Sequence, residues 1–100
     1  MSPNFNNLHK AFESRIRLGI MSALAVNDSL DFTSLRDLLD VTDGNLATHI
    51  KKLEQEDFVG VNKTFVDRKP NTKYFITKEG RAAFNKHLEV LEHIIKSQQA

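Results

Sequence analysis

Hydrophobic positions in the first part of the chain repeat at helical spacing. Apolar residues recur four positions apart from Leu8 to Leu24 and predict a first helix over residues 8–26. A second helix is expected to begin at a cap provided by Thr33 or Ser34. Between the two helices, Leu30-Asp31-Phe32 alternates briefly between apolar and polar residues and predicts a very short strand.

A third helix is predicted from a cap at Thr42 to about Glu56. Leu46, Ile50 and Leu53 would form its apolar face, and Asp43 in the first turn suits the positive end of the helix dipole. The second and third helices are separated only by a tight turn. Two short helices joined in this way are typical of a helix-turn-helix.

The hydrophobic period changes in the second half of the chain. Residues 58–66 are rich in β-branched and aromatic side chains and predict a strand, and residues 73–77 predict its return. Residues 67–72 between them contain Arg68-Lys69-Pro70-Asn71 and are expected to form a basic turn. A long helix is predicted over residues 78–97. The expected fold is mainly α with a small β-hairpin (α+β), namely a three-helix core, a β-wing and a long C-terminal helix.

The last helix has a wider apolar face than a small domain needs for its own core. No later segment remains to cover that face, so we expect a homodimer in which it packs with the first helix of both copies. The candidate interface residues are Leu8, Phe12, Phe84, Leu88, Val90, Leu91, Ile94 and Ile95. The whole chain, 1–100, is expected to be one domain, with a flexible N-terminus over residues 1–7 and a dimerisation helix over residues 78–97.

Composition narrows the class of protein. Hydrophobic residues make up 40% of the chain and charged residues 27%, as in ordinary globular domains. The absence of cysteine excludes disulfides and thiolate metal sites and agrees with a cytoplasmic protein. No signal peptide or membrane-spanning stretch is visible. The net charge of +1 does not by itself indicate nucleic acid, but charge is uneven: residues 63–73 hold four basic residues and one acid.

The third helix carries side chains suited to reading DNA in the major groove. Asn45 can pair bidentately with adenine, Thr48 can contact a base edge or a thymine methyl, and Gly44 permits close backbone approach. The candidate contacts on this helix are Thr42, Asp43, Gly44, Asn45, Thr48, His49, Lys51 and Lys52. Alternative interpretations remain at this point: Thr42 as a cap only, Asn45 and Thr48 as a solvated face, and His49 as a half-buried structural histidine.

Two further groups of residues are candidates for phosphate contacts. Ser34, at the start of the second helix, lies where backbone N–H groups favour an anion, although it too would serve as a cap. The hairpin contributes Lys63, Arg68, Lys69 and Lys73, which can hold phosphates or enter the minor groove. The alternative for the hairpin is a solubilising loop.

The segment Val41–Glu54, with its His49-Ile50-Lys51-Lys52-Leu53 run, resembles the recognition helix of winged-helix regulators of the MarR and ArsR type. The step Asp57-Phe58-Val59 is similar to their entry into the wing, although Asp57 stands where Gly is common. Residues 67–77 resemble their wing tip and return strand, and Thr77–Arg81 resembles the Thr-x-x-Gly motif that opens their final helix. The similarity covers residues 8–97 and is greatest to the compact, single-domain subgroup.

The resemblance implies a prokaryotic regulator that binds double-stranded DNA as a homodimer and represses by occluding a promoter. It implies no cofactor and leaves the effector unknown. The exposed face of the recognition helix lacks the Arg often found there, so no base preference is carried over.

Other functions compete with this interpretation. No nucleophile motif or phosphate-binding glycine loop supports an enzyme. His87, Glu89, Glu92 and His93 crowd the last helix, so a metal site completed across a dimer is an alternative, although solvated polar residues explain them better. A winged-helix protein-interaction module that does not bind DNA is the main alternative, in keeping with the near-neutral net charge and the acids of residues 54–57.

Overall fold

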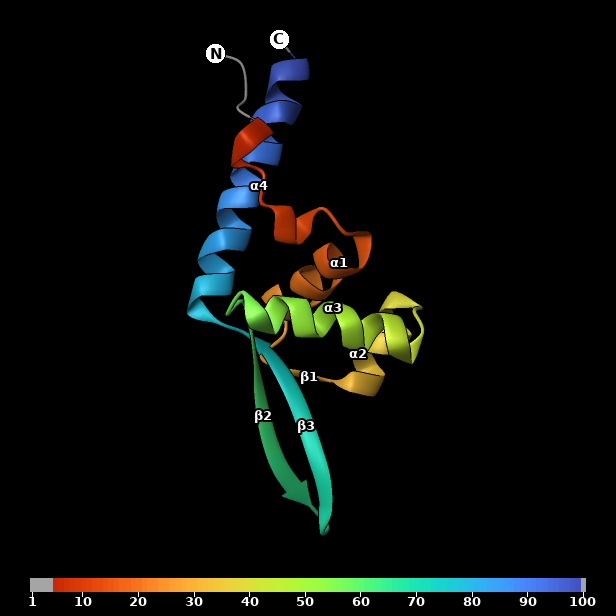
Figure 1. Ribbon diagram of the computed structural model, residues 1–100. Helices are drawn as coiled ribbons and strands as arrows, with labels where there is room; N and C mark the ends of the chain where they lie inside the picture. The colour runs from red at the N-terminus through yellow and green to blue at the C-terminus, as the bar shows by residue number, and fades with distance from the viewer. Residues whose placement is uncertain (1–4, 100) are drawn as a thin grey trace.

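The computed structural model describes residues 5–99, and the predicted α+β winged-helix fold is confirmed (Figure 1). The elements follow the order η1 Phe5–Asn7, η2 Lys10–Phe12, α1 Arg15–Ala25, β1 Leu30–Asp31, α2 Phe32–Leu39, α3 Asp43–Gln55, β2 Val59–Val66, β3 Lys69–Ile76 and α4 Lys78–Gln98. Residues 5–7 of the segment expected to be flexible form the short 3-10 helix η1. Residues 1–4 lie outside the described part of the chain.

The prediction of one continuous helix over residues 8–26 is wrong. The chain forms a separate 3-10 turn, η2, which His9 caps by accepting the Ala11 N–H at 3.0 Å. Ser14 then has extended backbone and accepts the Arg17 N–H at 3.3 Å, so it is the N-cap of α1. A Ser that satisfies an orphan helix N–H in this way favours a new helix start over continuation of the preceding turn.

The second helix begins earlier than predicted. Its N-cap is Asp31, whose carboxylate accepts the Ser34 N–H at 2.7 Å, so the predicted cap at Thr33 or Ser34 is wrong. This bond to Ser34 is the main reason that the pKa of Asp31 is lowered. The turn after α2 passes through Asp40, which has a φ of 52°. Aspartate tolerates this left-handed conformation better than most side chains, which allows the tight turn to α3.

The apolar faces of the helices meet in one core. The largest side chains that are fully buried come from α1, α2 and α3 and are Ile20, Met21, Leu24, Leu35, Leu46 and Leu53. Phe58, Val59 and Phe84 extend this core towards the sheet and α4. The three-helix body therefore fixes the orientation of α3 relative to the hairpin.

The sheet has the order β1-β3-β2, and both pairings are antiparallel. The short β1 pairs only Leu30 and Asp31 with Tyr74 and Lys73, which confirms the very short strand predicted over residues 30–32 except for Phe32, which begins α2. The β2–β3 hairpin is longer than predicted because its turn is only Asp67-Arg68, with φ values of 50° and 65°. Two positive φ values in succession are typical of the tight hairpin turn whose twist matches that of the strands.

The start of α4 is tied closely to the end of α3. Thr77 caps α4 by accepting the Gly80 N–H at 2.8 Å, and its hydroxyl donates to the Asp57 carbonyl at 2.5 Å. Gly80 lies directly against the backbone of Phe58, since a Cβ at this position would approach the Phe58 carbonyl oxygen to 2.1 Å. The Thr-x-x-Gly motif is thus explained by a cap and a close backbone contact.

An aromatic cluster joins the N-terminal segment to α4. The Phe12 ring lies 5.6–5.7 Å from the rings of Phe84 and Phe58, and 5.0–5.3 Å from those of His87 and His9. The His9 N–H donates to Nδ1 of His87 at 3.2 Å. Phe12 and Phe84, predicted at the dimer interface, are only 3% and 4% exposed and belong to the core of a single chain. That prediction is corrected for these two residues.

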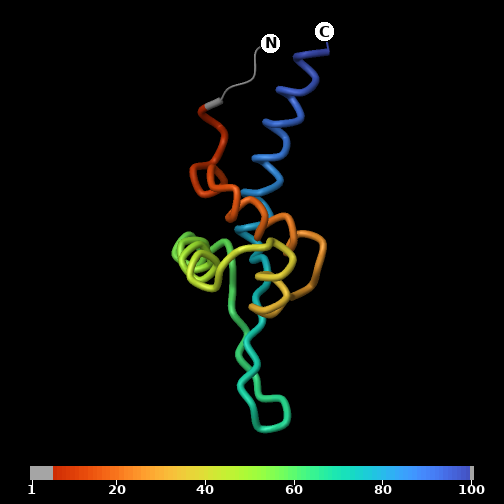
Figure 2. Tube along the Cα trace, turned by 90° about the vertical axis from the view of Figure 1, so that its right-hand side faces the viewer, coloured from red at the N-terminus to blue at the C-terminus, as the bar shows by residue number. Residues whose placement is uncertain are grey.

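The molecule is elongated, with principal extents of 57 × 25 × 21 Å. The hairpin and the C-terminal part of α4 project from opposite ends of the three-helix body, as both views show (Figures 1 and 2). None of the described helices is long and apolar enough to cross a lipid bilayer.

Candidate DNA-binding surface

The candidate DNA contacts lie on the exposed face of α3, on the start of α2, and on the hairpin that projects from the body. All of the predicted contacts are solvent-exposed except His49, which is half-buried; they are Ser34, Thr42, Asp43, Gly44, Asn45, Thr48, Lys51, Lys52, Lys63, Arg68, Lys69 and Lys73. Figure 1 shows α3 lying across the body with the hairpin extending away from it. The structure therefore places a polar helix face on the same body from which a basic hairpin projects.

The N-terminus of α3 is fixed by two interactions. Thr42 has extended backbone and accepts the Asn45 N–H at 3.2 Å, which confirms Thr42 as the N-cap. Arg36 of α2 forms ion pairs of 3.1 Å with Asp43 and with Asp37. Asp43, which was predicted to contact DNA, is thus paired with Arg36 of α2. The hydrogen bond to Asp43, followed by the hydrogen bond to Asp37, raises the pKa of Arg36. Arg36 orients α3 and was not identified from the sequence.

The outward face of α3 is polar and sterically open. Asn45, Lys51 and Lys52 are exposed, and the Thr48 hydroxyl donates to the Gly44 carbonyl at 2.9 Å, which leaves its oxygen lone pairs available. No atom lies within 4 Å of the position that a Cβ on Gly44 would occupy. Ala47 is also exposed on this face and was not among the candidates identified from the sequence. It lies three residues after Gly44 and four before Lys51, a spacing that predicts a shared helix face.

His49 links α3 to the first helix. Its Nδ1 lies 3.0 Å from Nη1 of Arg17, whose Nε donates to the Ala11 carbonyl at 2.6 Å. Since guanidinium nitrogens only donate, Nδ1 is the acceptor and the imidazole proton is on Nε2. Burial, followed by the charges of Arg17 and Lys52, lowers the pKa of His49. A structural role for this histidine, one of the two alternatives from the sequence, is therefore visible in its contacts.

The basic residues of the hairpin do not share one face. Directly paired residues lie on the same side of a sheet, and sides alternate along each strand. Lys69 pairs with Val66 and Lys73 with Asn62, which places both lysines on one face. Lys63 pairs with Thr72 on the opposite face, and Arg68 occupies the turn. The positive charge is therefore distributed over both faces and the tip of the hairpin.

The residue at the entry to the hairpin explains one departure from the family pattern. Asp57 has a φ of 62°, a left-handed conformation that glycine adopts most easily and aspartate tolerates. Its carbonyl accepts the Thr77 hydroxyl. Asp57 therefore adopts a backbone conformation that a glycine at this position would also allow.

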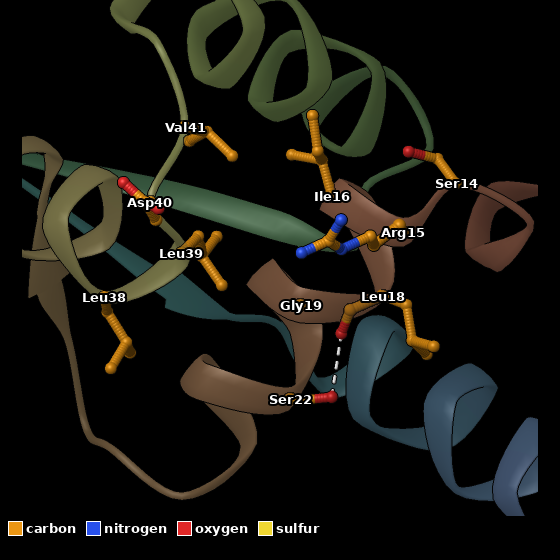
Figure 3. A pocket seen from close by; sticks show the side chains of 10 residues that line it. All are labelled: Ser14, Arg15, Ile16, Leu18, Gly19, Ser22, Leu38, Leu39, Asp40 and Val41. Carbon is orange, nitrogen blue, oxygen red and sulfur yellow. Dashed lines mark hydrogen bonds between the residues drawn. The ribbon is translucent and has the colours of Figure 1, made fainter.

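A groove of about 660 Å³ lies between α1 and the C-terminal end of α2 (Figure 3). Its α1 side includes Arg15, Ile16 and Leu18, and its other side includes Leu39 and Val41. The groove reaches the turn that leads into α3, so any molecule bound there would contact the segment that positions that helix.

The polar residues of α4 do not form a metal site within one chain. His87 was expected to be solvated, but it is only 6% exposed and its Nδ1 accepts the backbone N–H of His9. Burial lowers the pKa of His87, and the charge of His9 lowers it further. Among residues 5–99, no group of three or more His, Cys, Asp or Glu side chains is placed to hold a metal ion.

Comparison with known proteins defines the class. A family model of the winged-helix DNA-binding domain matches residues 16–95, and the chain belongs to this family. It is 37% identical over 84 residues to an uncharacterised protein of Methanocaldococcus jannaschii, an alignment that covers 83% of this chain and 91% of that protein.

Solved structures support the same assignment. A transcriptional regulator homologue from Pyrococcus horikoshii is 32% identical, with a TM-score of 0.79 and coverage of 96% of this chain and 100% of that one. A MarR-family regulator from Enterococcus faecalis, 22% identical, has the same fold, with a TM-score of 0.79 over 94% of this chain and 84% of that chain. The predicted resemblance to winged-helix transcriptional regulators is confirmed. The family and the fold are those of DNA-binding regulators rather than of enzymes.

Proposed function

We propose that this protein is a sequence-specific transcriptional regulator that binds double-stranded DNA as a homodimer on a pseudo-palindromic operator and represses by occluding a promoter. The observation that carries the proposal is that an exposed polar face of α3 and a basic hairpin directly following it in the chain project from one three-helix body. We propose that α3 enters the major groove and the hairpin the adjacent minor groove.

Side chains on α3 supply the sequence readout in this proposal. Asn45 pairs with an adenine, Thr48 contacts a base edge, and Lys51 and Lys52 reach phosphates or guanine edges. Thr42 sits where the helix N-terminus favours a phosphate, and Ser34 has the corresponding place on α2. Asp31 already accepts the Ser34 N–H, so Ser34 would contact DNA through its hydroxyl.

The surface proposed for dimerisation is the part of α4 that leaves the body. Leu88 and Ile95 are 42% and 56% exposed, which is costly for large apolar side chains in a monomer. They are joined by Val90, Leu91 and Ile94 on α4 and by Leu8, all half-buried in the single chain. For two copies of α3 to enter successive major grooves, a twofold axis through this surface would have to place them about 34–36 Å apart, one turn of DNA.

The DNA-binding proposal predicts a salt-dependent loss of affinity when the hairpin tip is neutralised. The double variant Arg68→Ala/Lys69→Ala should bind a random duplex pool about tenfold more weakly at low salt, because it removes about two phosphate contacts. The slope of log affinity against log salt should fall by about 2. Fluorescence anisotropy at several salt concentrations measures both quantities.

Lys86→Ala/Lys96→Ala is the matched control, since it removes the same charge from α4 at the other end of the molecule. This control should bind as the wild type does. Equal losses in the two double variants would mean that only net charge matters. No binding by the wild-type protein at low salt would reject the function and favour a protein-interaction module.

A methyl group added at the start of α3 should separate stability from DNA binding. Gly44→Ala meets no atom of the protein, so it should raise the free energy of unfolding by about 0.5–1 kcal/mol through helix propensity. It should also weaken DNA binding about tenfold if the backbone at Gly44 approaches the base edges. Thermal melts and anisotropy measure the two effects, and unchanged DNA affinity would show that this backbone stays clear of the DNA.

A further inference from the structure

The tip of the hairpin exposes apolar side chains that no other described residue covers. Phe65 is 77% exposed and Val66 is 54% exposed, although the body of the protein has ended several residues earlier along β2. Burying an aromatic side chain of this size is worth about 1.5–3 kcal/mol, so leaving it in water forgoes a substantial stabilisation. Its exposure therefore indicates a partner.

Phe65 lies on the face of the hairpin that contacts the core nearer the body, beyond the polar pair of Lys63 and Thr72. Its cross-strand partner is Pro70, and the same face carries Val59 and Tyr74, which contact the core nearer the body. Strand alternation thus places an aromatic ring and a proline ring opposite each other on one side of the tip. Because the fixed ring of Pro70 and the two-residue turn restrict the backbone, this pair is a rigid apolar projection.

Positive charge surrounds this apolar pair. Lys63 lies two residues before Phe65 on the same face, Arg68 occupies the turn, and Lys69 follows on the opposite face. Asp67 is the one acid among residues 63–73. An apolar projection between cations is complementary to a narrow groove lined by phosphates, and proteins that bind the minor groove use such side chains to separate stacked base pairs. A second copy of this chain would instead bring these cations against one another.

We propose that Phe65, supported by Pro70, is a wedge that enters the minor groove next to the sequence contacted by α3, opens one base step and bends the duplex. This inference rests on the proposed DNA-binding function and adds to it the shape of the bound DNA. Flexible pyrimidine–purine steps cost least to open, so the wedge would favour such a step at a fixed distance from the bases that α3 contacts.

The test compares variants at the two exposed apolar positions of the tip. The probe is a duplex recovered from a random pool on the wild-type protein, with a fluorophore at each end so that energy transfer reports the bend. Phe65→Ala should lose the bend and bind about tenfold more weakly, whereas Phe65→Leu, which keeps a wedge-forming side chain, should retain most of both. Val66→Ala removes an apolar side chain from the opposite face of the same strand and should change neither quantity.

Each other outcome has a defined meaning. If the wild-type protein binds the duplex without bending it, or if Phe65→Ala bends and binds it as the wild type does, the wedge is rejected and the DNA-binding function stands. Equal losses with Val66→Ala would also reject the wedge, because the effect would then not belong to one face. If the wild-type protein recovers no duplex, the proposed function and the wedge both fail. Thermal melts of the variants check that all three remain folded.

Discussion

Replacing Phe12 with alanine should lower the free energy of unfolding by about 3–5 kcal/mol. The ring is 3% exposed and contacts Phe58, Phe84 and His87, so truncation leaves a cavity where the N-terminal segment meets α4. A loss of this size removes much of the stability that a domain of this length usually has. Denaturant unfolding followed by circular dichroism measures it.

A matched truncation distinguishes the core from the proposed dimer interface. Ile95 is 56% exposed on α4, so Ile95→Ala should leave the fold of a single chain intact but weaken self-association. For Phe12→Ala, the free energy of unfolding should fall at every protein concentration. For Ile95→Ala, any loss of stability should depend on protein concentration, and sedimentation should show more monomer than for the wild type. If Phe12→Ala cost less than about 1 kcal/mol, its place in the core would be in doubt. A wild-type protein that is monomeric at micromolar concentration would reject the dimer.

Gly80→Ala should destabilise the protein by about 2 kcal/mol or more, although alanine is the better helix former. The new Cβ would lie 2.1 Å from the Phe58 carbonyl oxygen and 2.9 Å from the Phe58 Cα. These are backbone atoms, which cannot turn aside as a flexible side chain can. The start of α4 would therefore have to move away from the end of α3 and weaken the Thr77 cap. Thermal unfolding measures the loss.

Gly44→Ala is the internal control for this experiment. Both glycines lie in the first turn of a helix behind a threonine cap, but only Gly80 has backbone atoms close to its missing side chain. A loss with Gly80→Ala alone would assign the effect to contact with Phe58. Similar changes in both variants would show that helix propensity governs both sites and that the close contact at Gly80 can relax.

The sequence predicted those elements whose local signals agree with their tertiary surroundings. The sequence correctly predicted the helical spacing of apolar residues on α3, its Thr42 cap and the length of α4. At these places helix propensity, capping and burial all favour the same structure. The exposed residues of α3 and the hairpin were also identified from the sequence. Their contacts with DNA remain predictions.

The errors in prediction arose where a tertiary contact decides the local structure. Periodicity could not reveal the break before Ser14, because Phe12 has the spacing of α1 but its ring packs against Phe58 and Phe84. Asp31 was overlooked as a cap because it also lies in β1, where it pairs with Lys73. Likewise, the ion pair of Arg36 with Asp43 of α3 depends on where the turn through Asp40 directs the chain.

Pro70 also bears on whether the open edge of the hairpin can pair with other chains. Beyond the two residues paired with β1, the outer edge of β3 is open along the hairpin, and open strand edges promote aggregation by pairing with other chains. In a hairpin with a two-residue turn, the pair that flanks the turn, here Val66 and Lys69, is hydrogen-bonded across the strands. The next pair, Phe65 and Pro70, is not hydrogen-bonded, so the backbone nitrogen of Pro70 faces the outer edge of β3. Proline has no N–H to donate there. Pro70 therefore interrupts this edge of β3 near the tip of the hairpin, which disfavours its pairing with the strand of another chain.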